Sequence, residues 1–235
     1  MKKPNFAIIV CVHGDEKYGV EVIKKIKKFT NKTSVIIANP EALKKNKRFV
    51  DVDLNRCFPG KARGNREERI AFSLTKALKQ FDYVIDLHSS STETEPFIIT
   101  TRISTDHKKL ISCIPVRKVV IMTKKLAKGK ALIDHCKCGV SIEIGQHQNK
   151  NNAAKAVSII RRMLINIKNF SSSKKIFFKA YGISMHGDPH PPKLKNFVHY
   201  VEKKSKVYPL LITPKEYAGD SVHYLKARRI NYRNH

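Results

Sequence analysis

The sequence predicts an α/β protein in which a mostly parallel β-sheet is flanked by helices and followed by a small β-rich domain. In the first 170 residues, short apolar runs alternate with lysine-rich segments of helical period. This alternation is typical of βαβ units in a parallel sheet. After the serines at 171–173, the pattern changes to short strand-like runs. We therefore expect two domains, an α/β domain over residues 1–170 and a β-rich domain over residues 171–235.

The expected strands of the first domain are short apolar runs. We predict strands over residues 6–12, 34–38, 83–88, 97–101, 118–122 and 140–144. The expected helices carry apolar residues on one face and lysines on the other, as Val20, Val22 and Ile26 illustrate. We predict helices over residues 18–29, 65–80 and 153–170, and Asn65 is a good cap for the second of them.

The second domain contains two apolar runs, 175–180 and 207–212, which predict strands. A glycine- and proline-rich segment, 186–192, lies between them and predicts a loop. The chain ends in a basic segment, 226–233, which we expect to be disordered.

The composition is strongly basic, with 47 lysines and arginines against 19 aspartates and glutamates and a formal net charge of +28. A field of this size attracts anions, whether nucleic acid, an anionic membrane or a small acidic substrate. No stripe of basic residues is interleaved with aromatic residues, as a single-strand binder requires. We therefore interpret most lysines as solvated helix faces, and nucleic acid is a disfavoured partner that composition alone leaves open.

The cysteines and the chain start indicate a compartment. Five cysteines without framework spacing predict reduced thiols. The apolar runs fall short of the roughly 18 residues that a membrane-spanning helix needs. The first residues lead directly into a strand-like segment and lack a signal-peptide cleavage site. We expect a cytoplasmic protein without a membrane partner, and the sequence leaves monomer and homodimer open.

Candidate metal ligands follow two of the expected strands. His13 and Glu16 form a His-x-x-Glu pair on a tight turn after the first strand, where imidazole and carboxylate can converge on one cation. His88 ends another apolar run and completes a set of two histidines and one glutamate, a known catalytic zinc set. Asp86 shares a strand face with His88 and is expected to orient its ring. The sequence therefore predicts one zinc ion held by His13, Glu16 and His88.

Two other clusters contain metal-binding residue types. His135, Cys136 and Cys138 offer soft-metal donors, but no second cysteine pair completes the set. His186 and His190 lie in the glycine- and proline-rich segment, where a surface turn is the simpler interpretation.

A series of motifs lies along the chain in a distinctive order. They are His13-Gly14-Asp15-Glu16, Asn39-Pro40, the run from Arg48 to Arg56 that ends Asp-Leu-Asn-Arg, Phe58-Pro59-Gly60, Asp86-Leu87-His88 and Ile142-Glu143-Ile144-Gly145. This order resembles the aspartoacylase and succinylglutamate desuccinylase family of zinc carboxypeptidase-like hydrolases. The resemblance implies a mixed, mostly parallel sheet and a zinc-dependent amidohydrolase that removes the acyl group of an N-acyl amino acid.

The resemblance also implies roles for individual residues. Glu143 is expected to take a proton from water and pass it to the leaving amine. Arg48 is expected to stabilise the oxyanion of the tetrahedral intermediate. Asn55 and Arg56 are expected to hold a substrate carboxylate, for which guanidinium is a two-pronged donor. Tyr217 is expected to close over the substrate from the second domain.

One departure from the family bears on the substrate. The family has a further arginine upstream of its catalytic glutamate, and the corresponding stretch here, 130–135, contains none. Lys130 would replace it only as a point charge. The acyl group and the amino acid are therefore left open. Two alternative functions also stay open: a carboxypeptidase that uses the same residues, and an inactive basic protein associated with nucleic acid.

Overall fold

The computed structural model describes residues 4–27, 33–123, 126, 128–169, 173–214 and 222–232. Its strands are β1 (Phe6–Val10), β2 (Thr33–Ile37), β3 (Tyr83–Ser90), β4 (Phe97–Thr100), β5 (Lys118–Met122), β6 (Gly139–Gln146), β7 (Ile176–Met185), β8 (Tyr200–Glu202), β9 (Ser205–Leu210) and β10 (Val222–Ile230). The helices are α1 (Tyr18–Ile26), α2 (Pro40–Lys45), η1 (Leu54–Arg56), α3 (Arg66–Leu78), α4 (Thr105–Cys113), η2 (Leu132–His135) and α6 (Asn152–Asn169).

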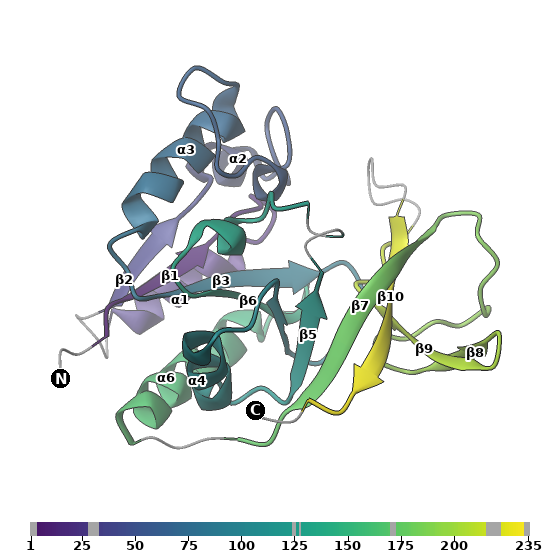
Figure 1. Cartoon of the computed structure of the whole chain (residues 1–235). Helices are drawn as coiled ribbons and strands as arrows, with labels where there is room; N and C mark the ends of the chain where they lie inside the picture. Colours follow the sequence, from purple (N-terminus) through teal and green to yellow (C-terminus); the bar gives the residue numbers. More distant parts are fainter. Residues whose placement is uncertain are drawn as a thin grey trace.

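The described strands form one sheet in the order β2-β1-β3-β6-β4-β5-β7-β10-β9-β8 (Figure 1). β1 runs parallel to β2 and β3, and β3 runs parallel to β6. β4 is antiparallel to β6, whereas β4, β5 and β7 are parallel to one another. This confirms the predicted mixed, mostly parallel sheet. The carboxyl ends of β1, β3 and β6 meet at one edge, where ligands of such sheets gather.

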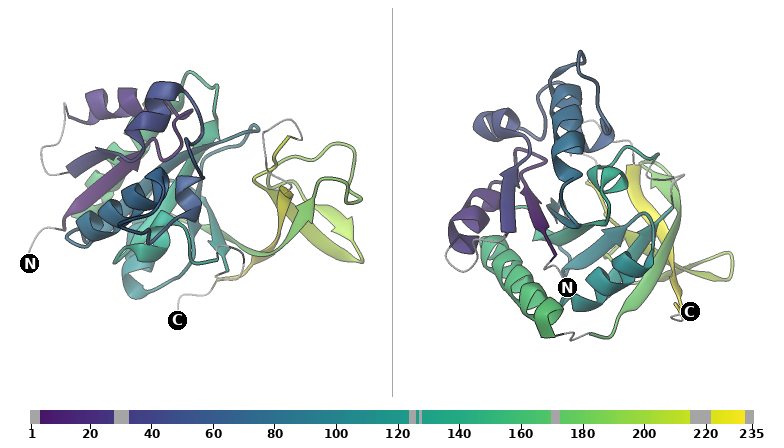
Figure 2. Two further views of the ribbon diagram at one scale, coloured as in Figure 1. Left: turned by 90° about the horizontal axis from the view of Figure 1, so that it is seen from above. Right: turned by 60° about the vertical axis from the view of Figure 1, so that its left-hand side comes forward.

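Both faces of the sheet are covered around β1, β3 and β6, which explains why these strands are continuous apolar runs. In β1, Phe6, Ile8 and Val10 pack on the side of α1, α4 and α6. Ala7 and Ile9 alternate with them and pack toward α3 on the other side. Figure 2 shows α3 and α6 on opposite sides of the first strands.

The elements predicted for the first 170 residues all occur, with ends that differ by at most three residues. The start of α3 follows the expected cap. The side chain of Asn65 accepts from the backbone N–H of Glu68, and the Glu68 carboxylate accepts from the N–H of Asn65. This reciprocal capping box satisfies two backbone donors that the first helical turn leaves unpaired.

The C-terminal strands continue the same sheet. β7 pairs in parallel with β5, and β10 lies antiparallel between β7 and β9. The predicted disorder of the basic segment is wrong for residues 226–230, which belong to β10, while Arg233 lies outside the described residues. Tyr224 and Ala227 are buried, so this strand has an apolar face despite its charge. The domain boundary at residue 170 stays a prediction.

In the part of the chain that the structure describes, no helix combines the length and apolar character needed to cross a bilayer.

A buried carboxylate fixes the loop that precedes η1. Glu67 lies in the first turn of α3 and is fully buried. Its Oε1 accepts from the N–H of Val50 at 2.7 Å, and its Oε2 accepts from the N–H of Asp51 at 3.0 Å. These bonds hold the loop between Arg48 and Asp53, two residues that the functional site uses.

We expect Glu67→Ala to lower the free energy of unfolding by roughly 2–4 kcal/mol, because one buried and several partly buried N–H groups lose their acceptor at about 1–3 kcal/mol each. Urea denaturation measures the change. The exposed Glu93 provides the control, and Glu93→Ala is expected to change stability by less than about 0.5 kcal/mol. Equal effects of the two substitutions would show that Glu67 does not organise this loop.

Candidate metal centre and active site

Two histidines and a glutamate meet at the carboxyl edge of the sheet. His13 and Glu16 lie in the turn after β1, and His88 lies in β3. Nδ1 of His88 is 3.3 Å from Oε1 of Glu16, and Nδ1 of His13 is 3.7 Å from the same oxygen. One ligand atom from each residue lies within 4.8 Å of the others, and no further group of this kind occurs among the described residues.

The turn that carries His13 and Glu16 is closed by local and distant contacts. The N–H of Glu16 donates to the carbonyl of His13 at 3.2 Å, and the N–H of Gly14 donates to the carbonyl of Arg48 at 3.1 Å. A Cβ atom at Gly14 would lie only 2.1 Å from the carbonyl carbon of Ala42 in α2. Glycine is therefore required for the turn to pack against α2 and direct both side chains to the same side.

A second carboxylate lies behind each imidazole. Nε2 of His88 is 2.8 Å from Oδ2 of Asp86, and Nε2 of His13 is 3.2 Å from Oδ1 of Asp53. When Nε2 carries the proton and donates it to the carboxylate, the lone pair of Nδ1 is directed toward Glu16. The predicted contact between Asp86 and His88 is confirmed. The contact of Asp53 was missed, because Asp53 is 40 residues from His13 and no local pattern joins them.

The charges in this group are strongly coupled. Burial alone would lower the pKa of His88, but the carboxylates of Asp86 and Glu16 raise it well above its usual value. Burial alone would raise the pKa of Glu16, but the nearby His88 and His13 bring it well below its usual value. The site therefore favours a carboxylate anion together with positive charge between the side chains.

These residues fit a divalent metal ion. Two imidazole nitrogens and a carboxylate oxygen are donors that zinc accepts, and catalytic zinc sites use three protein ligands and keep one position for water. The N–H of Ser89 donates to Oε1 of Glu16 at 2.8 Å and fixes this carboxylate. Each of the three donors is thus held from behind by a second hydrogen bond, as metal ligands commonly are.

Glu143 lies beside this group on the neighbouring strand. It is in register with His88 across β3 and β6, so the two side chains share a face of the sheet. Ser90 donates its hydroxyl to Oε2 of Glu143 at 3.2 Å. Burial raises the pKa of Glu143 above its usual value, since the opposing effect of His88 is smaller. A carboxyl group of this kind can both accept and return a proton.

Arg48 is joined to the metal centre through Asp53. Its Nη2 donates to Oδ2 of Asp53 at 2.9 Å, while the other oxygen of this carboxylate contacts His13. Asp53 also accepts from the N–H of Asn55 at 2.8 Å, and this bond caps the start of η1. The guanidinium is thereby placed next to the candidate metal ligands.

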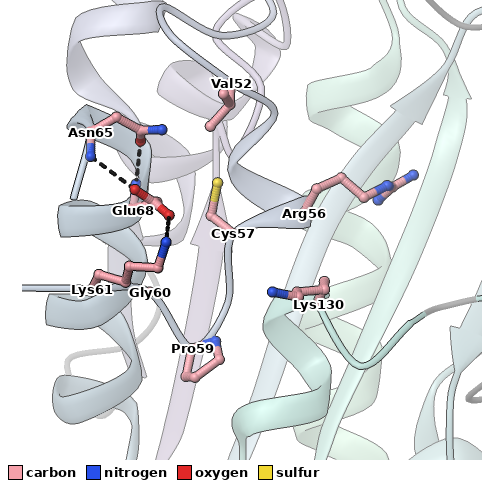
Figure 3. A pocket seen from close by; sticks show the side chains of 9 residues that line it. All are labelled: Val52, Arg56, Cys57, Pro59, Gly60, Lys61, Asn65, Glu68 and Lys130. Carbon is pink, nitrogen blue, oxygen red and sulfur yellow. Dashed lines mark hydrogen bonds and ion pairs between the residues drawn. The ribbon is translucent and has the colours of Figure 1, made fainter.

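Asn55 and Arg56 point to different surroundings. Nδ2 of Asn55 is 3.4 Å from Nε2 of His88, and its Oδ1 accepts from the N–H of Leu132 at 2.9 Å. Arg56 instead lines a cavity of about 390 Å³ next to η1. Figure 3 shows Asn65, Glu68 and Lys61 joined on one wall of this cavity, with Arg56 and Lys130 on the other.

The remaining candidates are less well placed or lie elsewhere. Tyr217 lies outside the described residues. Cys136 donates to the carbonyl of Leu132, and burial raises the pKa of its thiol to about 12. Nε2 of His135 is 3.0 Å from the carbonyl of Gly129. These contacts are typical of structural residues.

A histidine near Glu16 was missed by sequence reasoning. Nδ1 of His147 is 2.8 Å from the hydroxyl of Ser89, the residue whose N–H binds Glu16. Burial lowers the pKa of His147. Because His147 comes 58 residues after Ser89, only the pairing of β3 with β6 brings them together.

Comparison with known proteins gives a family and a fold. A model of the succinylglutamate desuccinylase/aspartoacylase catalytic domain matches residues 2–170. The chain is 28% identical over 167 residues to a probable aspartoacylase of Trichodesmium erythraeum, with 62% of this chain and 57% of that protein covered. It is 24% identical over 170 residues to N-acyl-aromatic-L-amino acid amidohydrolase (carboxylate-forming) B of Danio rerio, with 59% and 54% covered. The chain thus spans about half the length of the curated relatives it matches.

Solved structures of other proteins superpose on this structure over most of its length. Murine aminoacylase 3 superposes with a TM-score of 0.79 at 19% identity and covers 98% of this chain and 97% of its own. A succinylglutamate desuccinylase/aspartoacylase from Rhodobacter sphaeroides gives 0.74 at 15% identity, with 97% and 86% covered. At these identities the similarity concerns the fold, and it confirms the predicted zinc carboxypeptidase-like architecture.

We expect His13→Ala and His88→Ala each to lose most of the zinc that the parent chain retains after dialysis, because two ligands hold the ion far more weakly than three. Elemental analysis measures zinc per chain. The exposed His199 provides the control, and His199→Ala is expected to keep the parent zinc content. A His13→Ala protein that retains one zinc per chain would place the ion elsewhere.

Proposed function

Because the chain belongs to the succinylglutamate desuccinylase/aspartoacylase catalytic-domain family, we propose that it is a zinc-dependent amidohydrolase that cleaves the amide bond of an N-acyl amino acid. The observation that carries this proposal is the buried group of His13, Glu16 and His88 with Glu143 in register beside it. A zinc ion held by the three ligands would acidify a water molecule and polarise the amide carbonyl. Proton transfer, stabilisation of the oxyanion and binding of the substrate are assigned to side chains of the protein.

Glu143 is the proposed proton carrier. Its raised pKa lets a carboxylate take a proton from water and, as the acid, give it to the departing amine nitrogen. Ser90 holds one of its oxygens, so the carboxylate keeps its orientation in both protonation states. An amine is a poor leaving group unless it is protonated, so the second transfer matters as much as the first.

Arg48 is the proposed stabiliser of the oxyanion. A cation that is fixed before the reaction stabilises charge that develops only in the transition state, and this increases the rate. Asp53 supplies the fixation, because it binds Arg48 with one oxygen and His13 with the other. The loop that carries Arg48 is in turn held by the buried Glu67.

Asn55 and Arg56 are the proposed binding groups for a substrate carboxylate, with Lys130 as an added contact. Asn55 contacts His88, while Arg56 and Lys130 line the 390 Å³ cavity next to it. A planar guanidinium recognises a carboxylate with two donors, and a lysine adds a point charge. Tyr217 stays a proposed contact to the substrate.

The test of this function is a substrate panel of N-acetyl, N-succinyl and N-formyl amino acids, with a peptide as a carboxypeptidase substrate, run on zinc-loaded protein. Release of free amino acid from at least one acyl compound supports the proposal. Release of a C-terminal residue from the peptide, without deacylation, would make the chain a carboxypeptidase. No hydrolysis by a zinc-loaded chain would leave it a binding protein.

We expect Glu143→Gln to retain zinc and lose turnover by a factor on the order of a hundred or more, because glutamine cannot carry the proton. The exposed Glu21 in α1 provides the control, and Glu21→Gln is expected to keep parent kcat. Zinc content is measured on the same samples. Equal turnover of Glu143→Gln and parent would remove Glu143 from the reaction.

We expect Arg56→Ala to raise KM for the best acyl amino acid by at least about tenfold, or about 1.4 kcal/mol, with a smaller change in kcat. KM rises because the substrate carboxylate loses its contact with Arg56. This contact is expected to be equally strong in the ground state and in the transition state, so kcat changes less. Arg63 is exposed on the same loop, and Arg63→Ala serves as the control for net charge. A similar rise in KM for both variants would mean that Arg56 attracts the substrate only through its contribution to the net charge.

A further inference from the structure

A second cavity lies between α4 and the start of β7, and we call it the α4 groove. Its volume is about 640 Å³, within the range of roughly 300–1,000 Å³ that is common for ligand sites. The described residues that line it are Ile103, Thr105, Lys108, Lys109, Ile111, Ser112, Ser173, Lys174, Lys175, Phe177 and Tyr232. Figure 1 shows α4, the start of β7 and the end of β10 gathered at the lower edge of the molecule.

The α4 groove and the metal centre lie on opposite faces of the sheet. Ile142 and Ile144 flank Glu143 in β6 and pack in the core on the side of α4 and α6, so Glu143 points to the other side. Phe177 of the groove packs against this same core. The groove is therefore separate from the proposed catalytic residues.

One wall of the groove is a single face of α4. Thr105, Lys108, Lys109 and Ser112 are spaced so that they lie on one side of a helix. Ser104 caps the helix by accepting from the N–H of His107 at 3.3 Å, which fixes the start of this wall. The wall thus presents two hydroxyls and two ammonium groups.

The other wall adds positive charge, and the hydrogen-bond partners of its Lys175 among the described residues are not carboxylates. Nζ of Lys175 donates to the carbonyls of Val116 and Ile114 and to the hydroxyl of Ser173, all of which are neutral. Lys174 is exposed beside it. None of the described lining residues is acidic, so the groove attracts anions.

An aromatic pair lies at the same place. The rings of Phe177 and Tyr232 are 4.7 Å apart between centroids and inclined by 31°. Nζ of Lys108 lies 5.8 Å from the centroid of Tyr232. Cations beside an aromatic ring are the combination with which proteins bind single-stranded nucleic acid, since the cations attract phosphates and the ring stacks on a base.

We propose that the α4 groove binds single-stranded nucleic acid, with a base stacked on Tyr232 and phosphates beside Lys109 and Lys174. The net charge of +28 favours a polyanion over a single small anion, because the attraction extends beyond the groove. The aromatic pair favours a single strand over a duplex, whose bases are already stacked on one another. An acidic peptide would use the lysines but not the ring.

The experiment measures binding of a fluorescein-labelled thymidine 12-mer by anisotropy at one fixed salt concentration. An abasic 12-mer of equal charge tests for stacking, and we expect it to bind at least about tenfold more weakly, in line with the known contribution of a stacked base. A duplex of equal length and a polyglutamate peptide test the other polyanions and are expected to bind more weakly than the single strand.

Two matched variants separate the groove from the overall charge. We expect Lys109→Glu with Lys174→Glu to weaken binding of the thymidine 12-mer at least about tenfold, because two phosphate contacts become repulsive. Lys24→Glu with Lys44→Glu makes the same change in net charge at exposed sites of α1 and α2, and we expect a smaller effect. Tyr232→Leu is expected to weaken binding of the thymidine 12-mer but not binding of the abasic 12-mer.

Thermal unfolding and zinc content confirm that each variant is folded, and a misfolded pair is replaced by Lys109→Gln or Lys174→Gln alone. Equal losses in the groove pair and the control pair would overturn the proposal, because binding would then follow net charge. Tighter binding of duplex or polyglutamate, or equal binding of the thymidine and abasic strands, would overturn it as well.

Discussion

The candidate metal centre depends on two imidazole rings held between buried and partly buried carboxylates. Glu16 faces Nδ1 of both rings, while Asp53 and Asp86 bind the opposite nitrogens. Burying several carboxylates is costly unless positive charge lies among them. The fold meets this requirement by anchoring each carboxylate separately, with the N–H of Ser89 on Glu16 and the guanidinium of Arg48 on Asp53. The strand ends therefore hold a fixed set of charges that a divalent ion can complete.

Local patterns predict the elements whose signals are contiguous. The central strands are recognisable because both of their faces are buried, and α3 is recognisable from Asn65 and the glutamates after it. The strand β10 escaped prediction, because Lys226 and Arg228 give it the composition of a solvated tail. Its apolar contribution is limited to scattered residues such as Tyr224 and Ala227, and its partner β7 begins more than 40 residues earlier.

Contacts between distant residues could not be predicted, since they depend on strand order. His13 and Glu16 are adjacent on one turn, whereas Asp53 reaches His13 across 40 residues and His147 reaches Ser89 across 58. The buried role of Glu67 was hidden for the same reason, because its partners are backbone groups of another loop. The α4 groove is likewise assembled from three separated stretches, which is why no basic and aromatic stripe was visible in the sequence.

The central claim is that His13, Glu16 and His88 hold one metal ion beside Glu143. A crystal structure of the zinc-loaded chain, with anomalous diffraction measured at the zinc edge, tests it most directly. We expect one strong anomalous peak about 2.0–2.2 Å from Nδ1 of both histidines and from a carboxylate oxygen of Glu16. Glu143 should lie close to this peak without being a ligand. A peak only at other residues, or none at saturating zinc, would contradict the claim.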